Sequence, residues 1–183
     1  ASWQATMRIE VVDPGNQQIY LPAFPHSTPI VNLNLTNFPG RPGGSEIQGE
    51  NTLDMCLYDG KNSTSTRTYL RFEDDGLPST DRAEEAFSIR RRGGSQTDAR
   101  DRLDYQVFVT NPVTGATETI ANGKTLVWQG TNDPQHLRQV VLPGGRESVL
   151  CVPAPIVLKT PAFAASSKNA GDYTGTLRII YTP

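Results

Sequence analysis

Apolar side chains alternate with other residues along the C-terminal stretch DYTGTLRIIYTP. Leu177, Ile179 and Tyr181 are each separated by a single residue. A period of two predicts a β-strand with one face in a core. A strand leaves unpaired backbone groups at any edge that has no neighbour. The pattern therefore raises the question of which strands pair with the last one.

Short segments with the same alternation recur along the chain and are separated by Gly and Pro. Near the N-terminus, Met7, Ile9 and Val11 face one way, whereas Arg8 and Glu10 face the other. Roughly nine to eleven short strands separated by turn signals predict an all-β sandwich or barrel. Further strands are predicted in QIYLPAF, PIVNLNL, NTLDMCLYDG, TRTYLRFEDDG, LDYQVFVTNPVTG, KTLVWQG, LRQVVLP, ESVLCVP and PIVLKTP.

The segments between these strands are predicted to be turns and loops. Asp13–Asn16 reads as a turn, since Pro fixes φ and Gly accepts a positive φ. Phe38–Ser45 is rich in Gly and Pro and reads as a loop. Gly76–Asp104 is polar and charged, and reads as a long excursion with a short strand at Phe87–Arg91. The best helix candidate, DRAEEAF, is short.

Composition and charge narrow the function classes. The chain has 183 residues, of which 36% are hydrophobic, so one domain is expected. No run approaches the roughly 20 apolar residues of a membrane-spanning helix, so we expect no membrane insertion. The net charge of −2 gives no basic field that would attract nucleic acid. The N-terminal residues lack the features of a secretion signal, which we expect to have been removed or not included.

The chain offers no arrangement typical of an enzyme, a metal site or a cofactor site. His26 and His136 lie in predicted loops and are interpreted as surface residues. No Ser or Cys stands in a nucleophile elbow. The acidic stretch Glu73–Gly76 could bind calcium, but the alternating ligand spacing of a calcium loop is missing, which favours a solvated turn. Asn34 and Asn62 begin glycosylation sequons, a pattern that is common by chance.

Two cysteines, Cys56 and Cys151, lie in strand-like apolar contexts. They form no CxxC pair and the histidines are distant in sequence, so a zinc site is not favoured. Two readings stay open from the residues alone, a pair of reduced buried thiols and a disulfide between strands in an exported protein.

Several stretches together resemble one family: IYLPAF, NTLDMCLYDG, LRFEDD, VLCVPAPIVL and NAGDYTGTLRIIYTP. In their residues and in their order along the chain, they are similar to the C-terminal pilin domain of the tip-adhesin minor subunits of colonization-factor pili. These are class 5 chaperone–usher pili of the CFA/I type, assembled through the alternate-chaperone pathway. The most specific stretches are Asp54–Gly60 and Gly171–Ile179. The likeness runs from about Met7 to Pro183 and is weakest in the Gly76–Arg102 excursion.

The resemblance implies a fold and a role. Pilin domains of this type are immunoglobulin-like β-sandwiches that lack their final strand, and a donor strand from another chain completes them by β-augmentation. The implied partners are a periplasmic chaperone, the outer-membrane usher and the N-terminal extension of the major pilin. Cys56 and Cys151 match the family's domain cysteines and are expected to be bonded. Export through the periplasm to the fimbrial tip at the cell surface is implied.

Two predictions complete this reading. Residues 1–183 are expected to form a single pilin domain without the family's N-terminal adhesive domain. The donor-strand groove is expected to open between the first and the last strand. The residues expected to line it are Met7, Ile9 and Val11 on one wall, and Tyr173, Leu177, Ile179 and Tyr181 on the other.

Arg90–Arg92 is the only dense basic stretch and supports an alternative function. Guanidinium groups bind carboxylate and phosphate groups well, so a glycan- or matrix-binding sandwich acting through this surface is the alternative. A solvated strand end is the plainer interpretation of the same residues. A secreted hydrolase is a third reading with little support, because no acid–base pair or nucleophile stands out.

Overall fold

The described residues fold into β-strands joined by turns, with three short 3-10 helices at Ala99–Asp101, Pro134–His136 and Ala165–Ser167. The prediction of an all-β protein is thus confirmed. None of the helices in the described part is long and apolar enough to cross a membrane. The computed structural model describes residues 1–12, 17–24, 28–41, 44–77, 81–83 and 85–183.

Eleven of the described strands form one large sheet, which is curled rather than flat. Its main path runs β11-β7-β15-β8-β9-β14-β5-β4, and β1, β3 and β10 pair beside this path. The strands of this sheet are β1 (Trp3–Val12), β3 (Ile30–Asn32), β4 (Thr36–Arg41), β5 (Gly44–Leu53), β7 (Arg67–Asp74), β8 (Phe87–Arg91), β9 (Arg102–Thr110), β10 (Thr117–Ile120), β11 (Thr125–Gln129), β14 (Ile156–Ala164) and β15 (Gly171–Thr182).

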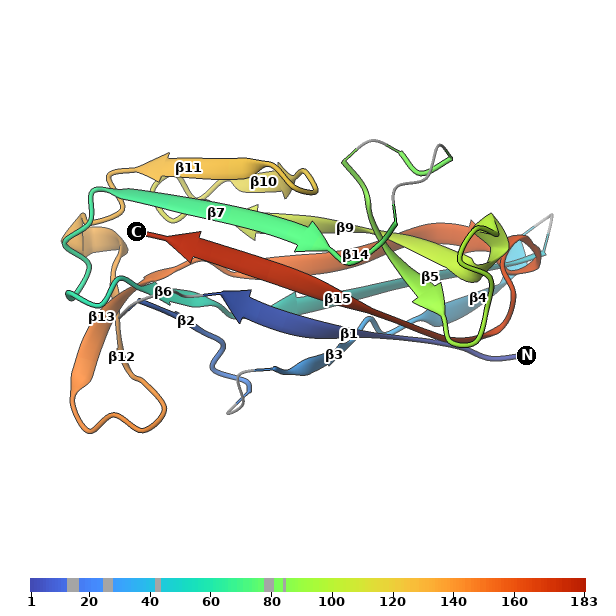
Figure 1. Ribbon diagram of the computed structural model, residues 1–183, viewed down its shortest axis with the longest axis horizontal. Helices are drawn as coiled ribbons and strands as arrows, with labels where there is room; N and C mark the ends of the chain where they lie inside the picture. Colours follow the sequence, from blue (N-terminus) through green and yellow to red (C-terminus); the bar gives the residue numbers. More distant parts are fainter. Residues whose placement is uncertain (13–16, 25–27, 42–43, 78–80, 84) are drawn as a thin grey trace.

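Four further strands form a smaller sheet in the order β12-β13-β6-β2. They are β2 (Gln18–Tyr20), β6 (Cys56–Tyr58), β12 (Arg138–Val141) and β13 (Ser148–Pro153). Figure 1 shows β7, β15 and β1 following one another across the molecule, with the two chain ends at opposite ends of its long axis.

The core lies between the inward faces of these strands. The alternation read from the sequence sets which residues enter it, because successive side chains of a strand point to opposite faces. Met7, Ile9, Leu177 and Ile179 are all fully buried in one continuous hydrophobic cluster. Gly175 allows β15 to approach β8, since a Cβ at this position would lie 2.6 Å from Ile89 Cγ2.

Three local predictions differ from the structure. The predicted loop at Phe38–Ser45 contains the end of β4 and the start of β5 in its described residues, and these two strands pair with each other. The described residues of DRAEEAF form a turn that leads into β8, and not a helix. The described part of the chain contains fifteen strands, more than predicted, because several are only three or four residues long. The predicted turn at Asp13–Asn16 lies outside the described residues.

Candidate functional site

The first strand, β1, lies between two other strands and pairs with both. Along one edge it runs parallel to β15, in a register from Trp3 opposite Gly171 to Val12 opposite Ile180. Along the other edge it runs antiparallel to β3, with Met7 opposite Val31. Two flanking backbone hydrogen bonds extend the second ladder, from Ile9 N to Pro29 O and from Leu33 N to Ala5 O, each 2.9 Å long. The backbone of β1 is therefore paired along its whole length on the β15 side and from Ala5 to Ile9 on the other side.

The inward side chains of β1 fill the space beside β15. Ala5, Met7 and Ile9 are fully buried, and Val11 is partly buried against the same cluster. Removing a side chain of the size of Met7 or Ile9 from water contributes about 1.5–3 kcal/mol. This strand is held by main-chain pairing along both edges and by alternate apolar side chains.

On the outward face, ion pairs link β1, β15 and β7. Arg178 of β15 donates from Nε to Glu10 Oε1 of β1 at 3.2 Å and from Nη1 to Glu73 Oε1 of β7 at 3.1 Å. Hydrogen bonds to Glu73 and Glu10 raise the pKa of Arg178, which remains cationic. These groups are partly exposed, so the ion pairs add little to the stability of the fold. They favour the observed register between β15 and its two neighbours.

Buried polar groups fix the N-terminal end of β15. The hydroxyl of Tyr173 donates to Asn169 O at 2.5 Å and lies 3.0 Å from Arg100 O. Burial raises the pKa of Tyr173 to about 12. Asp101 accepts from Arg91 Nε at 2.6 Å and from Asn169 Nδ2 at 2.8 Å. The Arg91 guanidinium beside Asp101 holds the pKa of that carboxyl well below its usual range.

The predicted groove residues are brought together, but the groove is not open. All seven predicted groove residues belong to the hydrophobic core. Six are fully buried, and Val11 is partly buried against them. The first and last strands pair directly, so no space separates the two expected walls. Sequence reasoning also missed β3 as the second neighbour of β1. The alternation in PIVNLNL indicated a strand there, but not where it would pair.

The Cys56–Cys151 disulfide is present, as the resemblance implied. It connects β6 to β13 within the smaller sheet and spans 95 positions of the sequence. Both cysteines are fully buried, and neither is available as a nucleophile or metal ligand. The cross-link joins the first third of the chain to its last third.

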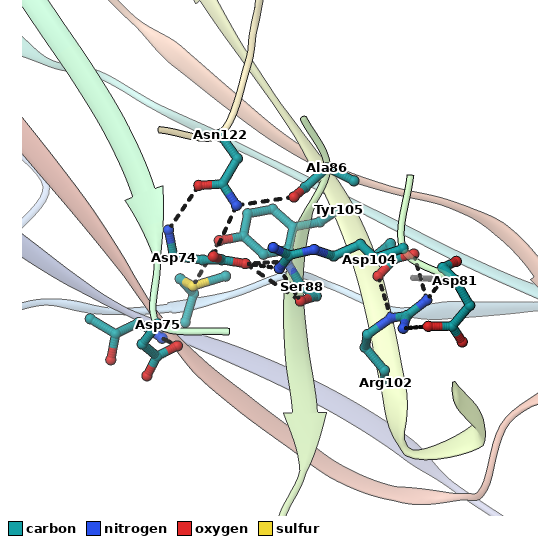
Figure 2. Close-up of polar contacts among 12 residues, drawn as sticks. Asp74, Asp75, Asp81, Ala86, Ser88, Arg102, Asp104, Tyr105 and Asn122 are labelled. Atoms are coloured by element: carbon teal, nitrogen blue, oxygen red, sulfur yellow. Dashed lines mark hydrogen bonds and ion pairs between the residues drawn. The ribbon is translucent and has the colours of Figure 1, made fainter. Parts of the chain in front are cut away.

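The polar excursion after β7 is tied to the outer face of the sheet by ion pairs (Figure 2). Arg82 donates to Asp74 Oδ2 at 2.9 Å, and Asp74 also accepts from Ser88 N at 2.8 Å. Arg102 donates to Asp81 at 2.8 Å and to Asp104 at 2.9 Å. The excursion is therefore attached at two points, one on each side of β8.

The three arginines of the basic stretch Arg90–Arg92 differ in their partners. All three line one hollow together with Asp75 and Thr174, but Arg91 is paired with Asp101. The side chains of Arg90 and Arg92 have no hydrogen bond or ion pair among the described residues, and Arg90 Nε and Nη1 are buried.

The remaining candidates have structural roles or carry no site. His136 is half-buried in a 3-10 helix, and His26 lies outside the described residues. Within the described ranges, no group of His, Cys, Asp and Glu is arranged to hold a metal ion. Asn34 donates to Glu50 O at 3.0 Å, and Asn62 accepts from Leu150 N at 3.3 Å, so both sequon side chains hold local structure.

A curated fimbrial protein is similar to this chain over the whole length of the chain. A curated relative, the E subunit of CFA/I fimbriae of Escherichia coli, is 29% identical over 186 residues, covering 100% of this chain and 46% of the relative. The chain thus spans about half the length of that relative.

Solved structures of related adhesins share the fold. A chaperone–tip adhesin complex of CFA/I fimbriae matches with a TM-score of 0.59 and 27% identity, over 93% of this chain and 42% of the other. A mutant of CfaE, the CFA/I adhesin of enterotoxigenic E. coli, matches with a TM-score of 0.62 and 21% identity, over 91% of this chain and 48% of the other.

A family profile delimits the matching region. The profile describes the second domain of the E subunit of CFA/I fimbriae and matches residues 17–183, so β3 and β15 lie within the profile match and β1 precedes it, although the alignment to the curated relative includes β1. The chain belongs to the family of this second domain of the CFA/I fimbrial protein CfaE.

Proposed function

We propose that residues 17–183 form a strand-acceptor domain that anchors a fimbrial adhesin to the next subunit of its fibre. The acceptor site is the slot between β15 and β3. In support, β1 lies between these two strands and pairs with both. A donor strand from another chain would take the same place, pairing with both neighbours through its backbone and filling the core with alternate side chains.

The observation that carries this proposal is the position of β1. It precedes the residues that the family profile matches, although the alignment to the curated relative includes it, and it is inserted between two strands of the profile region and paired with both of them. Without β1, one edge of β15 would be exposed along most of its length. The apolar side chains of Leu177, Ile179 and Tyr181 would become more exposed to water. Such an edge is a template for pairing with another chain.

This assignment revises the expected walls of the groove. Met7, Ile9 and Val11 act as occupants, and β3 with Val31 forms the wall opposite β15. The other four expected residues, all in β15, keep their role as a wall. Arg178 would select a donor strand with an acidic residue at the position of Glu10, because opposite charges on neighbouring strands favour pairing.

The proposed partners follow from this role. A periplasmic chaperone would supply the first donor strand, a proposal supported by the chaperone complex of a related adhesin. The outer-membrane usher would guide exchange of that strand for the N-terminal extension of the major pilin. The buried disulfide is consistent with folding in an oxidising compartment such as the periplasm. The place of action would be the fimbrial tip at the cell surface.

Binding of a donor peptide tests this function. The peptide copies the N-terminal extension of a class 5 major pilin, and the protein carries Ile9→Asp to weaken β1. At about one hundred times its Kd, the peptide should stabilise the domain by about 2.7 kcal/mol. For a domain of this size the midpoint of thermal unfolding should then rise by about 5–10 °C. A scrambled peptide is the control, and an equal response to both peptides would reject the proposal.

A further inference from the structure

We propose that the hollow lined by Arg90 and Arg92 is a docking site for an acidic side chain of a partner polypeptide. The hollow lies on the outer face of the large sheet and has a volume of about 240 Å³. Its walls come from the end of β8, the start of the excursion after β7, and β15. Gly76, Leu77, Gln96 and Thr174 are among the lining residues. No residue of β1 or β3 lines this hollow, so the inference does not rest on the proposed acceptor slot.

Arg90 and Arg92 have no ion-pair partner among the described residues, which distinguishes them from other arginines nearby. Arg82 is paired with Asp74, and Arg91 with Asp101. Arg102, which stands opposite Arg90 in the β8–β9 register, is held by two aspartates (Figure 2).

The guanidinium of Arg90 is also partly removed from water. Its Nε and Nη1 atoms are buried, and they have no hydrogen-bond partner in the part of the chain that the structure describes. Buried donors without an acceptor destabilise a protein, so an external acceptor would bind favourably.

The charge balance of the hollow favours a single carboxylate. Arg91 also lines the hollow, but its charge is balanced by Asp101. Arg90 and Arg92 then supply two positive charges and Asp75 supplies one negative charge, which leaves a net charge of +1. The Asp75 carboxylate accepts a hydrogen bond from Thr176 N at 3.2 Å, which directs one of its oxygens toward β15. One carboxylate balances the remaining charge. The guanidinium fork of Arg90 also matches the two oxygens of a carboxylate.

The surroundings of the hollow favour a polypeptide over a lone small acid. A second hollow of about 330 Å³ adjoins the first and shares Asp75, Arg92 and Thr174 with it. Leu77 lines the first hollow and Ile30 lines the second, and these apolar side chains are 55% and 67% exposed. The two hollows form a track with basic residues in the middle and an apolar contact at each end. An extended segment with a glutamate between two aliphatic residues fits this track.

Nuclear magnetic resonance of the arginine Nε–H groups tests the site in the full chain. The probe is the peptide acetyl-Leu-Glu-Leu-amide, and its neutral control is acetyl-Leu-Gln-Leu-amide. The acidic peptide should shift the Arg90 Nε–H signal in a saturable manner, and the neutral peptide should not. Arg92→Met, which replaces an exposed side chain, should weaken binding by about tenfold while Arg90 remains as the reporter. Arg146→Met, far along the chain and exposed, should leave binding unchanged.

Three results would overturn the proposal. The Arg90 signal could fail to shift, it could shift equally with both peptides, or it could respond only to general ionic strength. N-acetylneuraminic acid serves as the sugar-acid arm. Tighter binding of this acid than of the acidic peptide would reject a polypeptide partner. Failure of any of these tests leaves the acceptor slot unaffected, since the slot is tested by donor-strand binding.

Discussion

Ile9 of β1 lies opposite Leu177 of β15 in a parallel pair, and both side chains are fully buried. This pair stands near the middle of a ladder that runs almost the whole length of both strands. It explains how the last strand avoids an exposed apolar edge in the isolated chain. Under the proposed function, a donor strand would have to provide an apolar side chain at the position of Ile9.

Two arginine substitutions should differ in effect because their ion pairs differ in burial. The Arg82 and Asp74 side chains are 14% and 3% exposed, whereas Arg178 is 43% exposed. Arg82→Met should lower the free energy of unfolding by about 3 kcal/mol, since it leaves a buried carboxylate short of its partner. Arg178→Met should leave it nearly unchanged, because solvent screens exposed ion pairs. Urea unfolding of the two variants measures the difference, and equal losses would contradict this account of the excursion.

Asp101 should make stability depend on pH in the acidic range. Its pKa is lowered by the Arg91 guanidinium, by Asn169 and by Ser95 N. Stability from a lowered pKa is fully present above the unfolded value of about 3.9, and is lost as pH falls through the folded pKa. Unfolding measured from about pH 5 to pH 2 should therefore show a smaller loss of stability in Asp101→Asn than in the wild type. The control Glu147→Gln, at an exposed position, should retain the wild-type slope.

Loss of the disulfide should destabilise the domain without changing its fold. The Cys56–Cys151 bond closes a long loop, with a sequence separation of 95. Replacing both cysteines with serine should lower the free energy of unfolding by about 2–5 kcal/mol, chiefly through the unfolded chain. Denaturant unfolding with and without reductant measures this loss. A reductant effect that persists in the double variant would show that the bond is not its cause.

The sequence predicted which side chains of β15 are buried, but it did not predict which strands would flank it. The alternation of Leu177, Ile179 and Tyr181 is a local property, and the period of two fixes the face that each occupies. Pairing is decided between segments far apart in sequence, here by main-chain bonds and packing that no local pattern encodes. For this reason the sequence could identify β1 as a strand without showing that it pairs directly with β15 and with β3.

The local errors have similar causes. Gly and Pro in the Phe38–Ser45 segment suggested a loop, yet Pro39 and Gly40 lie within β4 and Gly44 begins β5. The helical propensity of DRAEEAF was overridden by tertiary contacts, since Arg82 binds Asp74 and Phe87 enters the core. Whether each arginine of Arg90–Arg92 forms an ion pair depends on which aspartates lie nearby, and only the folded chain determines that.

The most direct test of the central claim is rescue of a damaged β1 by the same strand supplied in trans. Ile9→Asp places a charge in the core and should lower the midpoint of thermal unfolding by about 10 °C or more. If β1 is an occupant of the slot, a peptide copying Trp3–Val12 should displace the damaged strand and restore most of the loss. Wild-type protein should respond weakly, because its own β1 competes at an effective concentration of roughly millimolar.

The matched control is Leu177→Asp, which places the same charge in the wall on β15. This variant should not be rescued, since the peptide cannot replace β15. Rescue of Ile9→Asp without rescue of Leu177→Asp is the predicted result. If the peptide rescues neither variant, β1 is a fixed wall of the sandwich, and the proposal that it fills a strand-acceptor slot is contradicted.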